Sequence, residues 1–305
     1  MKIRIGTRGS KLALWQAYQV QDLLRENGAE SAVTIIETKG DKILDVSLSK
    51  IGSKGVFTEE IEEQLKKGAI DIAVHSAKDL QSTLSEGFEI IAFGRREKPD
   101  DVLISSKKLN LESDALKIGT SSTRRVAMAK RLFPNFEIVP VRGNLQTRIK
   151  KMEKGACDAL WLAYAGVHRM GYESMIVHQF DLGEIIPAVG QGCLAIEGYE
   201  TLDPDKKSLI RKAINDPSSE ICLQAERSFL RTMDGGCSIP VYGLASLNEE
   251  VLTLKGGIVS LNGKEQITKT CYSTPNAALK AGKTLGESIL NSGGREILEK
   301  IKATI

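Results

Sequence analysis

Histidine, aromatic residues and long apolar runs are scarce in this chain. It has 3 histidines in 305 residues, and aromatic residues make up 5% of it. Its apolar runs, such as residues 159–167, are far too short to span a bilayer. Histidines this few, without ligand spacing, do not predict a metal site. Because the first residues also lack the apolar run of a signal peptide, we expect a cytoplasmic protein without membrane segment or metal.

Excess charge and paired cysteines are missing too. The formal net charge is +3, so the composition does not predict attraction to nucleic acid or to a membrane surface. The 5 cysteines are odd in number and lack C-x-x-C spacing, which argues against a disulfide framework or a zinc site. This usage fits a reducing compartment. What remains is a chain long enough for two or three ordinary globular domains.

What the chain does contain is a cationic turn that occurs twice. Residues 118–125 predict a strand, a glycine turn and a helix whose first turn holds Arg124 and Arg125. Residues 5–10 repeat the pattern with Arg8 and Ser10. A helix N-terminus has free N–H groups and partial positive charge, so hydroxyl and guanidinium groups there can receive an anion. The repetition predicts one polyanionic ligand that is held from two sides.

The order of elements also repeats around these turns. Residues 39–41 are echoed by 142–144, and residues 68–72 are echoed by 155–159, in the same order. We interpret the first two-thirds of the chain as two related α/β lobes with parallel sheets, the first with an insertion at 42–57. Ligands bind beyond the carboxyl ends of such strands. That edge would hold Arg8, Lys78, Asp79, Arg124, Arg125 and Arg142.

The last third of the chain has a different pattern. Three alternating strands, a hairpin at Asn262-Gly263 and two helices predict a small α+β domain with an antiparallel sheet. The predicted division is lobe 1 at 1–95 and 193–213, lobe 2 at 99–189, and a C-terminal domain at 216–305. Two crossings between the lobes, at 95–101 and 185–192, predict a hinge with the ligand in the cleft.

The pair Arg124-Arg125 is the clearest candidate for a binding function. Each cation at a helix N-terminus opposes the helix dipole by about 0.3–1 kcal/mol. No stabilising contact that would offset this cost is evident in the sequence, which indicates that the arginines bind a ligand. A single lysine, such as Lys50, Lys54 or Lys78, is equally well explained as ordinary surface charge.

Asp79 and Cys237 each allow two explanations. Asp79 ends an apolar strand, where the residues alone favour a helix N-cap over an acid/base group held ionised by nearby cations. Cys237 follows two glycines in a turn, so it is either an ordinary buried thiol or a reactive, modified one. His75 is expected to be a hydrogen-bonded structural residue.

Together these motifs resemble the porphobilinogen deaminase family over nearly the whole chain. The motifs lie at residues 6–16, 52–57, 75–79, 119–125, 142–148, 187–192 and 235–237. The resemblance implies two lobes like those of periplasmic binding proteins, and a third domain with a dipyrromethane cofactor on a thioether to Cys237. It further implies a transferase of haem and tetrapyrrole biosynthesis. Four porphobilinogen molecules would be deaminated, joined head to tail onto the cofactor and released as hydroxymethylbilane.

The resemblance also assigns roles to single residues. Asp79, with Lys78, would stabilise the azafulvenium ion left when ammonia departs and would move the protons. The cofactor would be bound by Cys237, Arg124, Arg125, Ser122, Lys78, Asp79 and Arg142. The substrate would be bound by Arg8, Ser10, Gln16, Arg142, Arg148 and Arg169. Lys50, Lys54 and Phe57 would belong to a lid, and the protein would be a monomer that needs neither metal nor nucleic acid.

Two positions depart from the family pattern. Leu80-Gln81 stands where the family usually has a hydrophobic residue and proline, and Thr123 replaces an apolar residue. Neither change removes a functional group, so both affect only local loop geometry.

The alternative from another class is a non-catalytic, two-lobed anion-binding protein such as a solute receptor. A secreted receptor would be expected to have a signal peptide. It would also have no need of Lys78-Asp79 or of the Gly-Gly-Cys loop. The sequence therefore favours the transferase.

Overall fold

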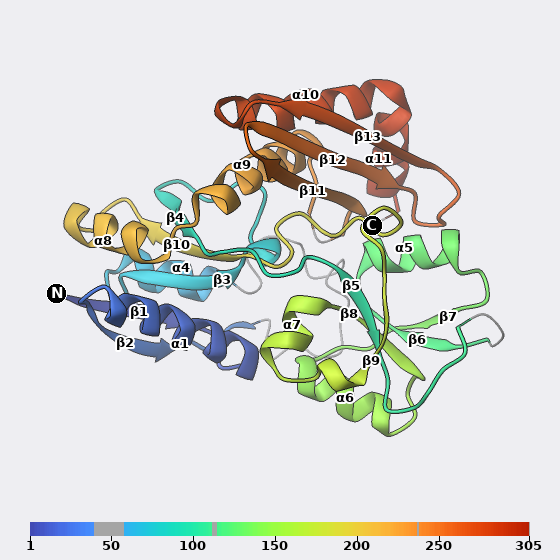
Figure 1. Ribbon diagram of the computed structural model, residues 1–305, viewed down its shortest axis with the longest axis horizontal. Coiled ribbons are helices and arrows are strands. Elements are labelled where there is room, and N and C mark those ends of the chain that lie inside the picture. Colours follow the sequence, from blue (N-terminus) through green and yellow to red (C-terminus); the bar gives the residue numbers. More distant parts are fainter. Residues whose placement is uncertain (40–57, 112–114, 237, 305) are drawn as a thin grey trace.

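The computed structural model describes residues 1–39, 58–111, 115–236 and 238–304. It contains three bodies: two lobes, each with a five-stranded sheet, and a third body with a three-stranded sheet (Figure 1). The predicted lid residues Lys50, Lys54 and Phe57, and the predicted cofactor residue Cys237, lie outside the described residues.

The sheet of lobe 1 has the strand order β2-β1-β3-β10-β4. Strands β1 (Lys2–Thr7), β2 (Glu30–Ile35) and β3 (Ile72–Ser76) are parallel. Strand β10 (Leu194–Tyr199) runs antiparallel to both β3 and β4 (Phe88–Phe93). Ile3 and Ile5 of β1 and residues 72–74 of β3 are buried at the centre of the sheet, as expected for a sheet covered on both faces.

Helices cover both faces of this sheet. Helices α1 (Lys11–Glu26) and α8 (Pro204–Ile214) share one apolar cluster with one face, and α4 (Glu59–Lys66) shares another cluster with the opposite face. Ser10 caps α1, because its side chain accepts a hydrogen bond from the Ala13 amide at 3.3 Å.

Lobe 2 repeats this topology. Its strand order is β7-β6-β8-β5-β9. The strands are β5 (Asp101–Ile104), β6 (Lys117–Gly119), β7 (Glu137–Val139), β8 (Ala159–Ala163) and β9 (Ile176–Gln179). The helices are α5 (Thr123–Leu132), α6 (Leu145–Glu153), α7 (Tyr164–Arg169) and the 3₁₀ turn η2 (Glu173–Met175).

The prediction of parallel sheets is wrong in one respect. Both sheets are mixed, because β10 in lobe 1 and β5 in lobe 2 run antiparallel to their two neighbours. Each of these strands enters its sheet straight from the other lobe, so it arrives at the edge where the parallel strands end. The sequence pattern of a buried strand is the same in either direction.

The third body lies over both lobes (Figure 1). Its antiparallel sheet has the order β11-β12-β13, and the turn between the last two strands contains Gly263 with φ +76°, as the predicted hairpin requires. Its elements are α9 (Pro217–Thr232), β11 (Val241–Asn248), β12 (Val251–Val259), β13 (Gln266–Ser273), η3 (Pro275–Ala277), α10 (Ala278–Ile289), η4 (Leu290–Gly294) and α11 (Arg295–Lys302).

Both crossings between the lobes are tied to the third body by one buried carboxylate. Glu226 of α9 is fully buried and accepts hydrogen bonds from both Nη atoms of Arg96, which lies in the first crossing. It also receives the amide of Gly190, from the second crossing, at 2.8 Å and the amide of Ala245, on β11, at 2.8 Å. Because all of these donors meet one charge, the crossings and the third body form a single packed unit.

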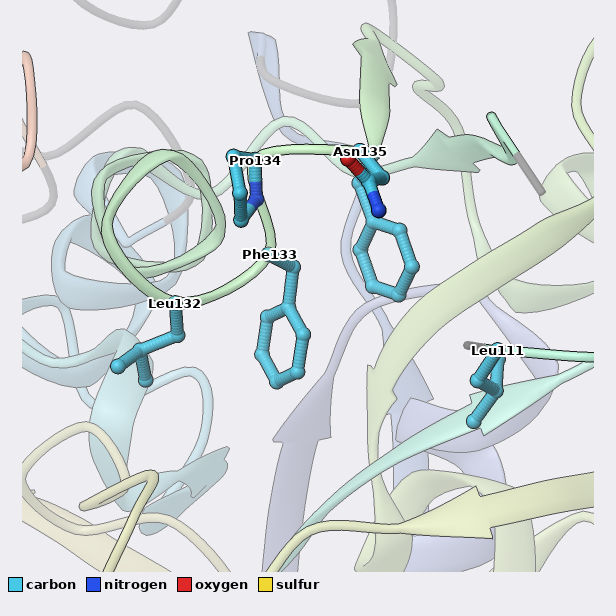
Figure 2. Close-up of a pocket in the computed structure, with 6 residues that line it drawn as sticks. Leu111, Leu132, Phe133, Pro134 and Asn135 are labelled. Atoms are coloured by element: carbon cyan, nitrogen blue, oxygen red, sulfur yellow. The ribbon is translucent and has the colours of Figure 1, made fainter. Parts of the chain in front are cut away.

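A pocket of about 260 Å³ opens beside the end of α5 in lobe 2. In Figure 2, Leu132, Phe133 and Pro134 stand on one side of it and Leu111 on the other. None of its six lining residues is charged, and Phe133 and Leu132 pack against the lobe 2 core. This pocket is an uncharged hollow at the edge of that core, and none of the predicted cationic residues lines it.

Candidate functional site

The predicted cationic helix N-terminus is present in lobe 2. Strand β6 ends at Gly119, and Ser122 caps α5 by accepting a hydrogen bond from the Arg125 amide at 3.5 Å. Arg124 and Arg125 follow in the first turn, and both are buried, with exposed fractions of 5% and 6%. Their burial distinguishes them from ordinary surface arginines.

A buried aspartate on β5 holds both arginines. Asp101 is fully buried and accepts Nη2 of Arg124 at 2.7 Å and Nη2 of Arg125 at 2.8 Å. It also accepts Nε1 of Trp161 at 3.0 Å. The two cations hold the pKa of this carboxyl far below its usual range, against the effect of burial.

We expected no protein partners that would offset the cost of placing the two arginines here, and this expectation is wrong. Arg124 also donates to the Ile186 carbonyl and Arg125 to the Trp161 carbonyl, each at 3.0 Å. Even so, two guanidinium groups share one carboxylate, which leaves one excess positive charge in the cluster. Nε of Arg124 is buried without a hydrogen-bond partner among the described residues. The cluster therefore keeps both a charge and a donor for an anionic group.

Gln191 joins this cluster to the second crossing. Its Nε2 donates to Asp101 Oδ1 at 2.8 Å and to the Pro99 carbonyl at 2.6 Å. Its Oε1 accepts Nη2 of Arg125 at 3.4 Å. The Gln191 amide is hydrogen-bonded to a carboxylate and to a guanidinium at the same time, so it restricts both groups. The second crossing therefore helps to orient the arginines.

On lobe 1, strand β3 leads into a short 3₁₀ turn, η1 (Ala77–Asp79). Asp79 is the last residue of this turn and is exposed, while Lys78 is partly exposed. The helix N-cap explanation of Asp79 is wrong, because η1 ends at this residue and Leu80 continues as extended chain.

Lys78 connects the two lobes electrostatically. Burial lowers its pKa to about 8, Asp79 and Asp101 raise it, and Arg125 and Arg124 lower it. The charge of Lys78 on lobe 1 therefore interacts with the arginine cluster on lobe 2. The end of β3 and the start of α5 therefore lie near enough for their charged side chains to interact.

Arg148 on α6 belongs to the same group of charges. Burial lowers its pKa first, Arg125 and Arg142 lower it further, and Asp79 raises it. Its Nε donates to the Gly143 carbonyl at 2.7 Å, which holds the side chain back along its own helix. The structure thus brings Arg148 from lobe 2 close to Asp79 from lobe 1.

The start of α1 forms another side of the site. Arg8 is partly exposed after β1, Ser10 caps the helix, and Gln16 is buried with Nε2 at 2.9 Å from Ser76 Oγ. Because Ser76 ends β3, Gln16 reaches the strand that carries Lys78 and Asp79. Its hydrogen bond supports that strand end.

Arg169 lies where the two lobes touch. Its Nη2 donates to the Gly192 carbonyl at 2.8 Å, and its guanidinium carbon lies 5.7 Å from the centre of the Trp15 ring on α1. Burial lowers the pKa of Arg169, and Glu97 raises it. This arginine contacts both the second crossing and lobe 1.

Sequence reasoning missed Asp101 and Gln191. The signal for Asp101 was an aspartate at the start of the fully apolar Val102–Ile104 run, where a buried charge needs a partner. Gln191 gave no such signal, because its partners lie about ninety or about seventy residues away in the chain and only the fold brings them together.

The described residues contain neither a candidate metal cluster nor a candidate membrane span. No group of three or more His, Cys, Asp or Glu side chains is placed to hold a metal ion. No helix in the described part of the chain has the length and apolar character needed to cross a membrane.

Comparison with known proteins identifies the family. A family model described as "Porphobilinogen deaminase, dipyromethane cofactor binding domain" matches residues 3–206, and one described as "Porphobilinogen deaminase, C-terminal domain" matches residues 220–291. The chain belongs to the porphobilinogen deaminase family. The predicted family and its dipyrromethane cofactor domain are thereby confirmed, and the alternative of a non-catalytic receptor is not supported.

Individual relatives agree. The porphobilinogen deaminase of Cytophaga hutchinsonii is 55% identical over 302 residues, which cover 98% of this chain and 97% of the relative. That of Desulfosudis oleivorans is 50% identical over 305 residues, covering 99% and 98%. Among solved structures, the VFT2 domain of Bordetella pertussis BvgS is 13% identical with a TM-score of 0.42, covering 75% of this chain and 91% of that domain.

The described residues fit the cofactor of this family. Dipyrromethane carries carboxylate side chains, and the two lobes offer the Arg124–Arg125 cluster with its excess charge, the ammonium of Lys78 and the guanidinium of Arg148, whose charges interact. The unpartnered Nε of Arg124 is a donor without another use among the described residues. Guanidinium and ammonium groups are the donors that carboxylates prefer.

Proposed function

We propose that this chain is a hydroxymethylbilane synthase that acts as a cytoplasmic monomer. It would join four porphobilinogen molecules head to tail onto its cofactor and release the linear product. The observation that carries the proposal is an exposed carboxylate, Asp79, which interacts electrostatically with cations of both lobes, Lys78 and Arg148. Such a site suits a substrate that carries carboxylates and becomes cationic during the reaction.

Binding is assigned to the cations around the cleft. Arg124, Arg125, Ser122 and Arg142, with Lys78, would hold the cofactor carboxylates. Arg8, Ser10, Gln16, Arg142, Arg148 and Arg169 would hold the incoming substrate and the growing chain. The buried Asp101 supports this assignment, because it fixes two of the guanidinium groups before any ligand arrives. Gln16 and Arg169 are held by Ser76 and by the Gly192 carbonyl, so both are suited to positioning neighbouring groups.

The acid/base work is assigned to Asp79. Its carboxylate is exposed and interacts electrostatically with Lys78 of the same turn and with Arg148 of lobe 2. It can therefore stabilise the cation that porphobilinogen becomes when ammonia departs. It can then accept the proton that the attacking pyrrole carbon loses as the new carbon–carbon bond forms. Lys78 would keep the carboxylate oriented and would pair with substrate carboxylates.

The cofactor is assigned to Cys237, which follows α9 in the third body. When bound there, dipyrromethane supplies the pyrrole carbon to which the first substrate is joined. The predicted division then separates three roles: lobe 1 would carry the acid/base chemistry, lobe 2 the carboxylate binding and the C-terminal domain the cofactor attachment. The lid role of Lys50, Lys54 and Phe57 rests on the family resemblance alone.

The decisive experiment replaces Asp79 by Asn. We expect the purified variant to carry the cofactor, seen as the dipyrromethane mass on the intact protein, while kcat falls by about 10²–10⁴-fold. The exposed Asp205→Asn is the matched control and should leave kcat unchanged. Near-normal turnover in Asp79→Asn would reject Asp79 as the acid/base group.

A further inference from the structure

The turn that carries Lys78 and Asp79 is packed against the third body. Its flanking residues Ala77 and Leu80 are buried, with exposed fractions of 2% and 5%. Both belong to the apolar cluster that contains Leu223 and Phe229 of α9. The charged pair therefore stands between two apolar anchors, and the surface under these anchors is supplied in part by α9.

The strand that leads into this turn is fixed by a buried pair. His75 on β3 lies with Nε2 at 3.0 Å from Glu197 Oε2 on β10, and both side chains are buried. This confirms His75 as a hydrogen-bonded structural residue. Oε1 of Glu197 has no hydrogen-bond partner among the described residues, so the carboxylate remains incompletely compensated.

The chain that leaves the turn is fixed by Arg227 of α9. Its Nη2 donates to the Gln81 carbonyl at 2.7 Å, and the residue is only 7% exposed. Burial lowers its pKa to about 10, Arg231 lowers it further, and Glu197 raises it. Arg227 thus compensates Glu197 through its charge while it holds Gln81 through a hydrogen bond.

The hydrogen bond to Gln81 has no close substitute in the described structure. Leu80 is extended, with φ −76° and ψ 146°, and its amide makes only a long bond of 3.4 Å to the Ala77 carbonyl. The Gln81 carbonyl is therefore a firm point of attachment directly after Asp79. Burying a guanidinium group costs free energy of desolvation. Here the buried group makes a hydrogen bond that fixes the turn.

We propose that Arg227 is a positioning residue for the reaction. It fixes the Lys78–Asp79 turn to α9, and the same helix leads to Cys237 shortly after it ends at Thr232. Helix α9 thereby holds in place the turn that carries the proposed catalytic carboxylate. This inference rests on the role proposed above for Asp79.

The test replaces Arg227 by Met, which has a similar apolar stem but neither donor nor charge, and by Lys, which keeps the charge. Arg231→Met is the matched control, because Arg231 lies one turn further along the same helix and is exposed. Three properties are measured on the holoenzymes: cofactor mass, kcat and KM for porphobilinogen, and amide hydrogen exchange of residues 77–82.

We expect Arg227→Met to retain the cofactor and to keep KM within about twofold. Its kcat should fall by about tenfold to a hundredfold, because small misplacements of a catalytic group have effects of that order. Exchange at residues 77–82 should accelerate, Arg227→Lys should be intermediate, and Arg231→Met should match the parent. A parent-like kcat in Arg227→Met would overturn the proposal.

Amide hydrogen exchange keeps the test decisive if Arg227→Met does not fold, or if Asp79 is not the acid/base group. If Arg227→Met does not fold, Arg227→Lys decides: faster exchange at 77–82 with a lower kcat supports the proposal, and parent-like exchange overturns it. If Asp79→Asn retains its turnover, the proposed function fails. The exchange data would then still report whether Arg227 fixes the turn, so the two failures are distinguishable.

Discussion

The two lobes share one topology but use charge in opposite ways. Lobe 2 buries Arg124 and Arg125 at a helix N-terminus and compensates them with the fully buried Asp101. Lobe 1 exposes Asp79 at the end of a 3₁₀ turn and buries the hydrogen-bonded pair His75 and Glu197 on the strands behind it. The carboxyl ends of the strands therefore carry buried, hydrogen-bonded cations in lobe 2. At the same position lobe 1 carries an exposed carboxylate.

This difference shows how a repeated fold becomes an active site. A binding group benefits from being fixed, because a preorganised guanidinium loses little freedom when a carboxylate arrives. In the proposed function Asp79 moves protons, and such a group must reach the reacting atoms, which fits its exposed place on a short turn. The supporting charges, Asp101 and Glu197, are buried in both lobes and are the places where the comparison can be tested.

The largest effect is expected for Asp101→Asn. It leaves two buried guanidinium groups without their shared counter-charge, and breaking a buried charge pair costs about 3–5 kcal/mol. Urea unfolding should show this loss, and the purified protein should lack cofactor by intact mass. Asp100→Asn, one residue earlier, is the control. Parent-like stability and loading in Asp101→Asn would mean that the arginines do not need Asp101.

A smaller loss is expected for His75→Leu on lobe 1. It leaves the buried Glu197 without its 3.0 Å partner, and an unsatisfied buried acceptor costs about 1–3 kcal/mol. Denaturant unfolding should show this destabilisation, with cofactor loading retained. If His75→Leu destabilised the protein as strongly as Asp101→Asn, the contrast between the lobes would not hold.

Arg148→Gln tests the cation that lobe 2 contributes beside Asp79. Because Arg148 is assigned to substrate carboxylates, we expect KM for porphobilinogen to rise by about tenfold, as for the loss of one charge-assisted hydrogen bond. The exposed Lys154→Gln, just after the same helix, is the control. A change in kcat alone would instead place Arg148 in the proton-transfer step.

The smallest effect is a pH dependence set by Lys78. Its folded pKa is lowered by burial to about 8, so the charged form that binds carboxylates is present below this pH and is lost as pH rises through it. Bound carboxylates favour the charged form, so KM should begin to rise only above about pH 8. Lys78→Arg should remove this rise, because arginine stays charged.

The same shift has a consequence for stability. The unfolded chain binds the Lys78 proton more tightly than the folded one, because 10.5 is the ordinary value and the folded pKa is about 8. The free energy of unfolding should therefore increase between these two pH values. A stability profile that instead falls in this window in the parent and not in Lys78→Arg would contradict the assigned direction.

Local pattern predicted much of the fold and part of the site. The strand–turn–helix around Arg124 and Arg125, the short strand before Asp79 and the hairpin at Asn262-Gly263 all follow from short-range propensities. The explanation of the arginines was incomplete, because their partner Asp101 lies in a strand that is contributed after a crossing. The direction of that strand could not be predicted either, because a buried strand has the same hydrophobic pattern in both directions.

The sequence by itself determined the family, the order of the elements and the positions of the cations, because these depend on short stretches of chain. Only the tertiary structure decided which charges meet. Arg227 and Gln81 are 146 residues apart, and Asp101 and Gln191 are 90 residues apart, yet both pairs are hydrogen-bonded. Such contacts depend on how whole lobes pack, and no local propensity encodes them.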